Sequence, residues 1–240
     1  DYKHPVVLAK ELATLDLLSD GRLEIGIGAG WMATDYEQSG MQYDRPGVRI
    51  DRFLEGLEII KRAMTGEKFS FSGKHYTITD YTATPLPVQK PCPPILIGGG
   101  GPRVLKLAAQ LADIIGVNPS LKDGVVNGET IKDMSAEAVQ EKIDIITANA
   151  GARMPDIELN VRTFLVNIRD SAQEAIEGTA NMFKVDPSLV ANSPFAILGP
   201  PAKIAEDLLA RRERWGFSYV IVGGEDVEKF APVIKILAGK

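Results

Sequence analysis

The sequence contains little cysteine and little histidine. Its single cysteine, Cys92, excludes an internal disulfide, and two histidines are too few and too far apart to form a metal site. We expect His4 to cap the first helix and His75 to be exposed on a hairpin. There is no lysine- or arginine-rich block, and the formal net charge of −5 argues against nucleic acid or an anionic membrane as the main partner. No apolar run approaches the roughly 20 residues that span a bilayer, so the expected location is the cytoplasm.

A regular alternation of apolar strands and amphipathic helices runs through the chain. Helices are predicted at 4–20, 46–64, 102–112, 136–150, from 171 onward, at 199–216 and at 225–237. Strands are predicted at 22–29, 94–99, 113–118, 157–167 and 218–223. Mostly apolar strands between helices are typical of parallel strands that are buried on both faces. The predicted fold class is therefore α/β, with a parallel sheet or barrel.

Residues 67–91 interrupt this alternation. They are rich in aromatic residues, Thr and Pro, and Ser72-Gly73 forms a turn signal, which predicts a small hairpin near 67–90 and then an extended Pro-rich segment. No low-complexity tract or linker divides the chain, so we expect one domain over residues 1–240. In the opening helix, the predicted apolar face consists of Val6, Leu8, Ala9, Leu12, Leu15 and Leu18.

Three predicted strands end in glycine clusters, and a helical pattern follows each one. The clusters are Gly28-Ala29-Gly30-Trp31, Gly98-Gly99-Gly100-Gly101-Pro102-Arg103 and Gly223-Gly224. Glycine lets the backbone approach a ligand closely because no Cβ intervenes. The start of a helix offers N–H groups and a partial positive charge to an anion. A tight turn can also demand glycine, but three such junctions indicate a cofactor across the carboxyl ends of the strands.

The second cluster is the sharpest of these candidate sites. Its four glycines expose successive N–H groups, Pro102 suits the first helical turn, and Arg103 adds positive charge. Composition alone favours phosphate binding and a plain flexible turn equally. If phosphate binds there, Gly100→Asp should weaken cofactor binding while the fold survives, because the loop is expected to face the cavity and not the core.

Each of the remaining candidate binding residues could instead have a purely structural role. Trp31 could wall a flat ring, although core packing is the slightly favoured interpretation. Asn118 follows a predicted strand, where its amide could bond the edge of a bound ring or could cap the next loop. Gly223-Gly224 is equally consistent with a ligand contact and with a simple turn.

Two charged residues fall inside predicted strands. Glu24 and Arg162 would be costly there unless they are paired, so we expect both to be buried with partners. A structural role is favoured over a catalytic one. On this expectation, Glu24→Ala would destabilise the protein by roughly 3–5 kcal/mol.

Residues 4–30 follow the spacing HP-x-x-x-A-x-x-x-x-x-LD-x-LS-x-GR-x-x-x-G-x-G-x-G, with every fixed position met. On this run the chain resembles the bacterial luciferase-like flavin monooxygenase superfamily. Residues 85–113 resemble the same family's Pro-rich lead into its fifth strand and phosphate-contacting loop. The sequence GAGWM, followed by DYEQSGMQYDRPGVRIDR, is most similar to the branch that uses the deazaflavin coenzyme F-420 rather than FMN.

The resemblance implies a (β/α)8 TIM barrel with the cofactor at the carboxyl ends of its strands. It also implies that this chain begins just after the family's third strand, so that the first three strands and their contacts to the cofactor ring are missing from it. The strands at 22–29 and 218–223 would then be sheet edges, which we expect N-terminal residues or a partner chain, as in a homodimer, to cover. For residues 98–103 the resemblance favours phosphate binding over a plain turn.

Two functional hypotheses follow from these patterns. The first is an oxidoreductase that transfers a hydride to or from a small organic substrate through coenzyme F-420, with FMN-dependent monooxygenation as the alternative. The second is a non-catalytic flavin-binding relative, which would bind cofactor without turnover. No nucleophile–base pair stands out, and Gly26–Gly30 lacks the G-x-G-x-x-G spacing of a dinucleotide fold, so the catalytic residues stay unidentified.

Overall fold

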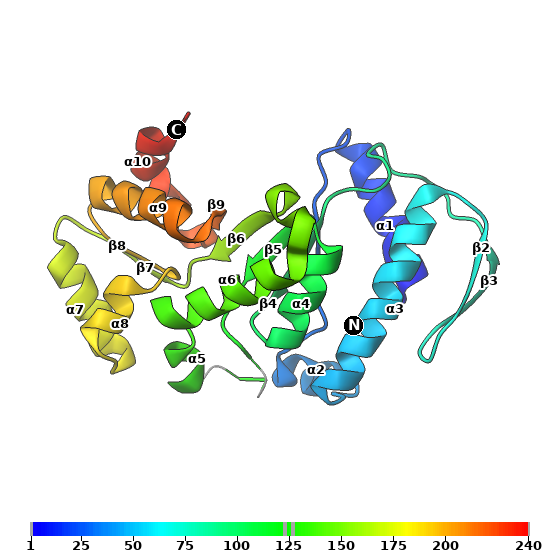
Figure 1. The fold of residues 1–240 in the computed structure, drawn as a ribbon, viewed down its shortest axis with the longest axis horizontal. Coiled ribbons are helices and arrows are strands. Elements are labelled where there is room, and N and C mark those ends of the chain that lie inside the picture. Colours follow the sequence, from blue (N-terminus) through cyan, green and yellow to red (C-terminus); the bar gives the residue numbers. More distant parts are fainter. Residues whose placement is uncertain (1, 122–123, 126–127, 240) are drawn as a thin grey trace. The chain divides into compact units, whose positions relative to one another are not determined.

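Figure 1 presents the chain as a computed structural model, which describes residues 2–121, 124–125 and 128–239. These residues form two compact units. The first unit contains residues 2–97 with 124–125, and the second contains residues 98–121 with 128–239. The single-domain organisation expected from the sequence stays a prediction.

The main sheet has five strands in the hydrogen-bonded order β1-β4-β5-β6-β9. These strands are β1 (Ile25–Ile27), β4 (Ile95–Gly99), β5 (Ile114–Val117), β6 (Glu158–Arg162) and β9 (Phe217–Ile221). β1 pairs in parallel with β4, β5 with β6, and β6 with β9. All four residues of β5 are buried, as expected for a strand covered on both faces. The predicted α/β class and the five predicted parallel strands are therefore confirmed.

The strand predicted at 157–167 is wrong in its extent, because the chain changes hydrogen-bonding partner within it. The Thr163 N–H still donates to the Ile221 carbonyl of β9, at 2.9 Å. The next N–H, that of Phe164, donates instead to the Phe195 carbonyl at 2.9 Å. The segment therefore divides into β6 and β7 (Leu165–Ile168), and β7 pairs in parallel with β8 (Ala196–Gly199), a strand that the sequence pattern does not predict.

The long helices follow the predicted alternation. They are α1 (Pro5–Leu18), α3 (Pro46–Thr65), α4 (Pro102–Leu111), α6 (Ala136–Ala150), α7 (Ala172–Phe183), α9 (Pro201–Trp215) and α10 (Val227–Leu237). Short elements absent from the prediction are α2 (Ala33–Ser39), α5 (Gly128–Lys132), α8 (Pro187–Asn192) and the 3-10 turns η1 (Gly151–Asp156) and η2 (Gly224–Asp226). His4 caps α1 as predicted, because its Nδ1 accepts the Val6 N–H at 3.3 Å. Within the described ranges, no helix combines the length and apolarity that crossing a membrane requires.

In the first unit, α1 packs against α3, and Figure 1 shows the two helices side by side. The buried face of α1 consists of Pro5, Ala9, Ala13 and Asp16. The predicted apolar face is therefore wrong at its end, where Leu15 is 51% exposed and Leu18 is 80% exposed. Two alanines one turn apart let the helices approach closely, and this contact outweighs the larger leucines in choosing the buried face.

The hairpin predicted near 67–90 is present as β2 (Phe69–Ser72) and β3 (Thr77–Tyr81), which pair antiparallel. Glu55 of α3 holds its turn, because its carboxylate accepts the N–H groups of Lys74, His75 and Tyr76 at 2.8, 2.8 and 3.1 Å. His75 is half-buried, so the prediction that it is exposed is wrong. The carboxylate therefore holds the turn, with His75 in it, against α3.

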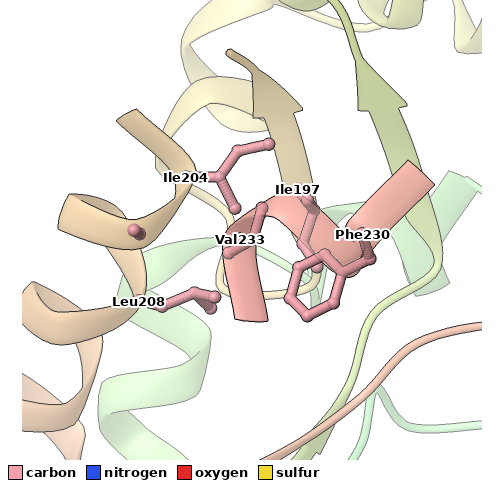
Figure 2. Close-up of a cluster of buried hydrophobic side chains, with 6 residues drawn as sticks. Ile197, Ile204, Leu208, Phe230 and Val233 are labelled. Carbon is pink, nitrogen blue, oxygen red and sulfur yellow. The ribbon is translucent and has the colours of Figure 1, made fainter. Parts of the chain in front are cut away.

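The second unit has an apolar cluster between β8, α9 and α10, drawn in Figure 2. The cluster contains Ile197, Ile204, Ala205, Leu208, Phe230 and Val233, each less than 9% exposed. Figure 2 shows Ile204 and Leu208 from α9 pointing toward Val233 and Phe230 from α10. The packing of these side chains holds α9 and α10 against β8.

Candidate functional site

The glycine clusters lie where the sequence places them, directly after parallel strands. In the first unit, β1 ends at Ile27, opposite Ile97 of β4, and Gly28–Trp31 follow it. In the second unit, Gly98 and Gly99 end β4, Asn118 follows β5, and Gly223 and Gly224 follow β9. Carboxyl ends of parallel strands that carry loops are where α/β enzymes build their sites.

The loop from Gly98 to Arg103 has the features of an anion site at the start of α4. Gly101 is the N-cap with an extended backbone (φ −82°, ψ 146°), and Pro102 occupies the first turn. In α4, all of which is described, no side chain caps the N-terminus and no acidic residue lies in the first turn. The first helical hydrogen bond runs from the Leu105 N–H to the Gly101 carbonyl at 3.1 Å. Within α4 itself, the positive end of the helix therefore has no carboxylate that would compete with an anion.

The four glycines of this loop are not equivalent. A Cβ at Gly98 would lie 3.3 Å from Nδ2 of Asn118, and one at Gly99 would lie 2.4 Å from Cγ1 of Val104. A Cβ at Gly100 would lie 2.2 Å from the carbonyl oxygen of Asn118. At Gly101, nothing among the described residues lies within 4 Å of that position. The prediction that the fold tolerates Gly100→Asp is therefore wrong, because that residue packs against backbone, and Gly101 is the open position.

Asn118 forms the wall beside Gly100. Its N–H donates to the Gly99 carbonyl at 3.0 Å, and its side-chain Nδ2 donates back to the Gly116 carbonyl at 3.3 Å. The amide therefore braces the end of β5, and both roles considered for Asn118, a ligand contact and a cap of the following loop, stay predictions. Its side chain is half-buried, next to the glycine backbone.

A buried ion pair, which sequence reasoning missed, holds the segment after Asn118. Lys142 of α6 is 5% exposed, and its Nζ lies 2.6 Å from Oδ1 of Asp133. The other carboxylate oxygen of Asp133 accepts the Ser120 N–H at 2.6 Å. The pair thus ties the chain beyond the wall to α6. Lys142 follows Val139 in the helical pattern of apolar positions, and that position was the available signal for its burial.

The loop after β1 has a different construction. Gly28 is exposed, and nothing described lies within 4 Å of a Cβ built on it, so the backbone is open to a flat ligand. Gly30 has φ +75°, a conformation that favours glycine. Trp31 is 36% exposed, so its interpretation as a core residue is wrong. The Tyr43 hydroxyl donates to the Trp31 carbonyl at 2.8 Å.

Arg49 contacts this loop, and the sequence did not identify it as a site residue either. It is 3% exposed, its Nη1 donates to the Asp44 carbonyl, and its Nη2 donates to the Gly30 carbonyl at 3.4 Å. Its guanidinium carbon lies 4.2 Å from the centre of the Tyr43 ring, within the range of cation–π attraction. Arg49 shares a helix face with Phe53, Gly56 and Ile60, so its place in the apolar stripe of α3 could have predicted its burial.

The loop after β9 is less suited to an anion. Gly223 is the N-cap of η2, whose first turn contains Glu225 and Asp226. A Cβ at Gly223 would lie 2.9 Å from Oε1 of Glu225. These carboxylates repel a phosphate, and a simple turn accounts for Gly223 and Gly224. Their role in binding stays a prediction.

The predicted burial of Glu24 and Arg162 is wrong, since both residues are exposed. Glu24 precedes the first residue of β1, and Arg162 ends β6 with its guanidinium carbon 5.3 Å from the Phe164 ring centre. Each therefore lies at a strand end and not in its buried middle. Among the described ranges there is also no group of three His, Cys, Asp or Glu residues able to hold a metal ion.

Comparison with known proteins identifies the family of the chain. The sequence profile of the luciferase-like monooxygenase family matches residues 2–219. The chain belongs to this family. In this luciferase-like chain, the glycine loops after β1 and β4 lie within the matched range, whereas Gly223 and Gly224 lie beyond it.

Relatives of the chain use two different cofactors. It is 29% identical over 187 residues to an FMNH(2)-dependent dimethylsulfone monooxygenase of Pseudomonas putida, covering 78% of this chain and 47% of the relative. It is 34% identical over 110 residues to an F-420-dependent glucose-6-phosphate dehydrogenase of Microbacterium testaceum, covering 46% of this chain and 32% of the relative. The chain thus spans about half the length, or less, of these curated relatives.

A solved structure supports the fold. The coenzyme F-420-dependent tetrahydromethanopterin reductase of Methanopyrus kandleri superposes with a TM-score of 0.75 at 19% identity, covering 97% of this chain and 78% of that one. At this identity the likeness concerns the fold, and it agrees with the parallel α/β architecture.

Proposed function

We propose that the protein is an oxidoreductase that binds coenzyme F-420 and transfers a hydride to or from a small organic substrate. The observation that carries the proposal is the start of α4, where glycines, an uncapped helix and the absence of acidic residues in the first turn suit a phosphate group. The glucose-6-phosphate dehydrogenase relative, which is named as F-420-dependent, supports the choice of cofactor. The start of α4 is the proposed anchor for the phosphate of such a cofactor.

FMN-dependent monooxygenation is the second candidate function. The dimethylsulfone monooxygenase relative, which is named as FMNH(2)-dependent, matches a larger share of this chain, 78% against 46%. Both cofactors carry phosphate, so the glycine loop serves either one. When bound, the cofactor supplies the redox chemistry, and the chain's own groups bind the phosphate, place the ring and exclude water.

Different groups of the chain are proposed to bind the phosphate and the ring of the cofactor. Backbone N–H groups at the start of α4 hold the phosphate, and Arg103, exposed in the first turn, adds positive charge. The open Gly28 lets a ring approach the backbone, and Trp31 offers it an aromatic wall. The proposed assembly is a homodimer in the cytoplasm that acts on a small molecule.

Titration of the purified protein with F-420 and, separately, with reduced and oxidised FMN tests the proposal. Gly101→Asp places a negative charge at the open position and should weaken binding by about tenfold to several hundredfold, through loss of one or two charge-assisted hydrogen bonds. Gly128→Asp is the matched control, because it puts the same side chain at the start of α5, where no described residue lies within 4 Å of the added Cβ.

Equal weakening by both variants, or none by either, would contradict a phosphate site at α4. Binding of FMN but not of F-420 would favour the second candidate. Binding of either cofactor without turnover on any carbonyl or alcohol substrate tested would favour a non-catalytic relative.

A further inference from the structure

Two side chains donate hydrogen bonds to consecutive backbone carbonyls in the loop that follows β1. The Tyr43 hydroxyl donates to the Trp31 carbonyl at 2.8 Å, and Nη2 of Arg49 donates to the Gly30 carbonyl at 3.4 Å. Arg49 and Tyr43 also support each other, because the guanidinium carbon lies 4.2 Å from the ring centre. We call this pair of side chains, with the two carbonyls, the Trp31 clamp.

Arg49 is a costly residue to bury for packing alone. It is 3% exposed, and among the described residues its Nε is buried without a hydrogen-bond partner. A buried cation with an unmet donor opposes folding unless its other contacts compensate. An apolar side chain of similar volume would fill the same place on α3 without that cost. The hydrogen bonds from Arg49 to two backbone carbonyls therefore indicate that it holds the loop.

Two glycines fit tightly around the clamp. Gly30 has φ +75°, and a Cβ there would lie 1.9 Å from the Tyr36 hydroxyl. Gly124 has φ +73°, and a Cβ there would lie 2.6 Å from the Tyr43 hydroxyl and 3.1 Å from the Trp31 carbonyl oxygen. Tyr36 therefore leaves no room for a side chain at Gly30, and the clamp leaves none at Gly124. The two glycines and the clamp together restrict the path of the backbone at Trp31.

We propose that Arg49 and Tyr43 are positioning residues that determine where the Trp31 indole stands against the ring of the bound cofactor. The inference rests on the proposed function, because it assigns a ring to the open face beside Gly28 and Trp31. Both residues act through backbone carbonyls. Tyr43 holds Trp31 directly, while Arg49 holds Gly30 and keeps the Tyr43 ring in place.

The first arm of the test uses the protein without cofactor. In a Trp215→Phe background, Trp31 is the remaining tryptophan, and its fluorescence reports on the loop. Tyr43→Phe removes one O–H group and keeps the ring, and Arg49→Lys keeps the charge and loses the planar fork. Both should raise acrylamide quenching of Trp31 and shift its emission to the red, because the indole becomes more mobile and more hydrated.

Matched controls come from the same unit. Tyr81→Phe removes a hydroxyl from a ring that packs against Phe69, with ring centres 6.0 Å apart. Arg62→Lys replaces another α3 arginine that lies over an aromatic ring, 4.7 Å from the Phe69 centre. Neither control touches the Trp31 loop, so neither should change the quenching of Trp31.

The second arm measures cofactor affinity in the same four variants. Tyr43→Phe and Arg49→Lys should weaken binding between about twofold and tenfold, the effect of losing one positioning hydrogen bond. Unchanged quenching in both clamp variants would overturn the clamp itself. Changed quenching with unchanged affinity and turnover would overturn its role toward the cofactor. If the parent protein binds neither cofactor, the proposed function fails, and the quenching arm still decides whether the clamp exists.

Discussion

At the scale of single residues, adjacent glycines in one loop have different physical roles. Gly100 lies against the backbone of Asn118 and Pro119, where a Cβ would come within 2.2–2.6 Å of three backbone atoms. Gly101 has an ordinary extended backbone and open space around it. The first glycine is required by packing, and the second leaves the helix N-terminus accessible.

Alanine substitutions should separate these roles. Gly100→Ala should destabilise the protein by about 1–3 kcal/mol, the usual effect of forcing an extra atom into a packed site. Gly101→Ala should stay within about 0.5 kcal/mol of the parent, because the restriction of the unfolded chain by alanine offsets the loss of glycine at the N-cap. Urea denaturation measures both values. Equal destabilisation by the two variants would contradict this assignment.

Asp16 is a second residue whose role depends on its partners. Its side chain is fully buried and accepts the Gln89 N–H at 3.0 Å and the Gln89 Nε2 at 2.7 Å. Burial by itself would raise the pKa of Asp16, but the hydrogen bonds from Gln89 and from the Leu23 N–H outweigh it and lower the pKa below its ordinary value. The carboxylate ties α1 to the Pro-rich segment and to the chain before β1.

The stability of the protein should therefore depend on Asp16 and on pH. Asp16→Asn should lower the free energy of unfolding at pH 7 by about 1.5–3 kcal/mol, through loss of charge-assisted hydrogen bonds. Because the folded pKa is depressed, the carboxylate's contribution is complete above the unfolded pKa of about 3.9 and is lost as pH falls through the folded pKa. Denaturation curves at pH 7, 5, 4 and 3 should show the two proteins converging at low pH, with Asp156→Asn as the exposed control. A constant difference at every pH would contradict the argument.

At the scale of secondary-structure elements, the ends of helices and hairpins decide local behaviour. The start of α4 has neither a side-chain cap nor an acidic residue in its first turn, whereas η2 begins with two acidic residues. We therefore expect the first loop to bind an anion and the second to repel one. The turn of the β2–β3 hairpin also depends on one charged group, the carboxylate of Glu55. Burial would raise the pKa of Glu55, but the N–H groups of His75, Lys74 and Tyr76 lower it overall.

Removal of this carboxylate should release the hairpin from α3. Glu55→Ala should lower the free energy of unfolding by about 1.5–3 kcal/mol and should speed hydrogen exchange at residues 74–76, since their N–H groups lose a charged acceptor. Glu58→Ala is the matched control on the same helix, because its ion pair with Arg62 is exposed and 3.6 Å long and should contribute less than about 1 kcal/mol. Unchanged exchange at the turn would show that the apolar contacts of the hairpin hold it without Glu55.

At the scale of the whole molecule, cofactor binding should appear as thermal stability. A ligand that binds only the folded chain at 100 times its dissociation constant adds about 2.7 kcal/mol, which for a chain of this size raises Tm by about 5–10 °C. Differential scanning fluorimetry with the tighter of the two cofactors measures this shift. Gly101→Asp at the same cofactor concentration should remove most of the shift, and Gly128→Asp should retain it. Loss of the shift in both would point to a general charge effect.

Local sequence determined much of this protein by itself. The alternation of apolar strands and amphipathic helices predicted the α/β class, the five parallel strands and the hairpin, because periodicity and turn residues act over a few positions. The run from His4 to Gly30 indicated the family. The glycine loop before Pro102 was also visible in the sequence, because helix starts carry local signals.

Only the tertiary structure decided which partners the segments choose. The switch of pairing at Thr163 and Phe164 depends on Ile221 and Phe195, residues far along the chain. The same holds for the backbone contact that makes Gly100 intolerant of a side chain, and for the burial of Arg49 beneath Tyr43. Glu24 and Arg162 stand exposed because burial depends on where a strand ends within its sheet, which an alternating pattern does not specify.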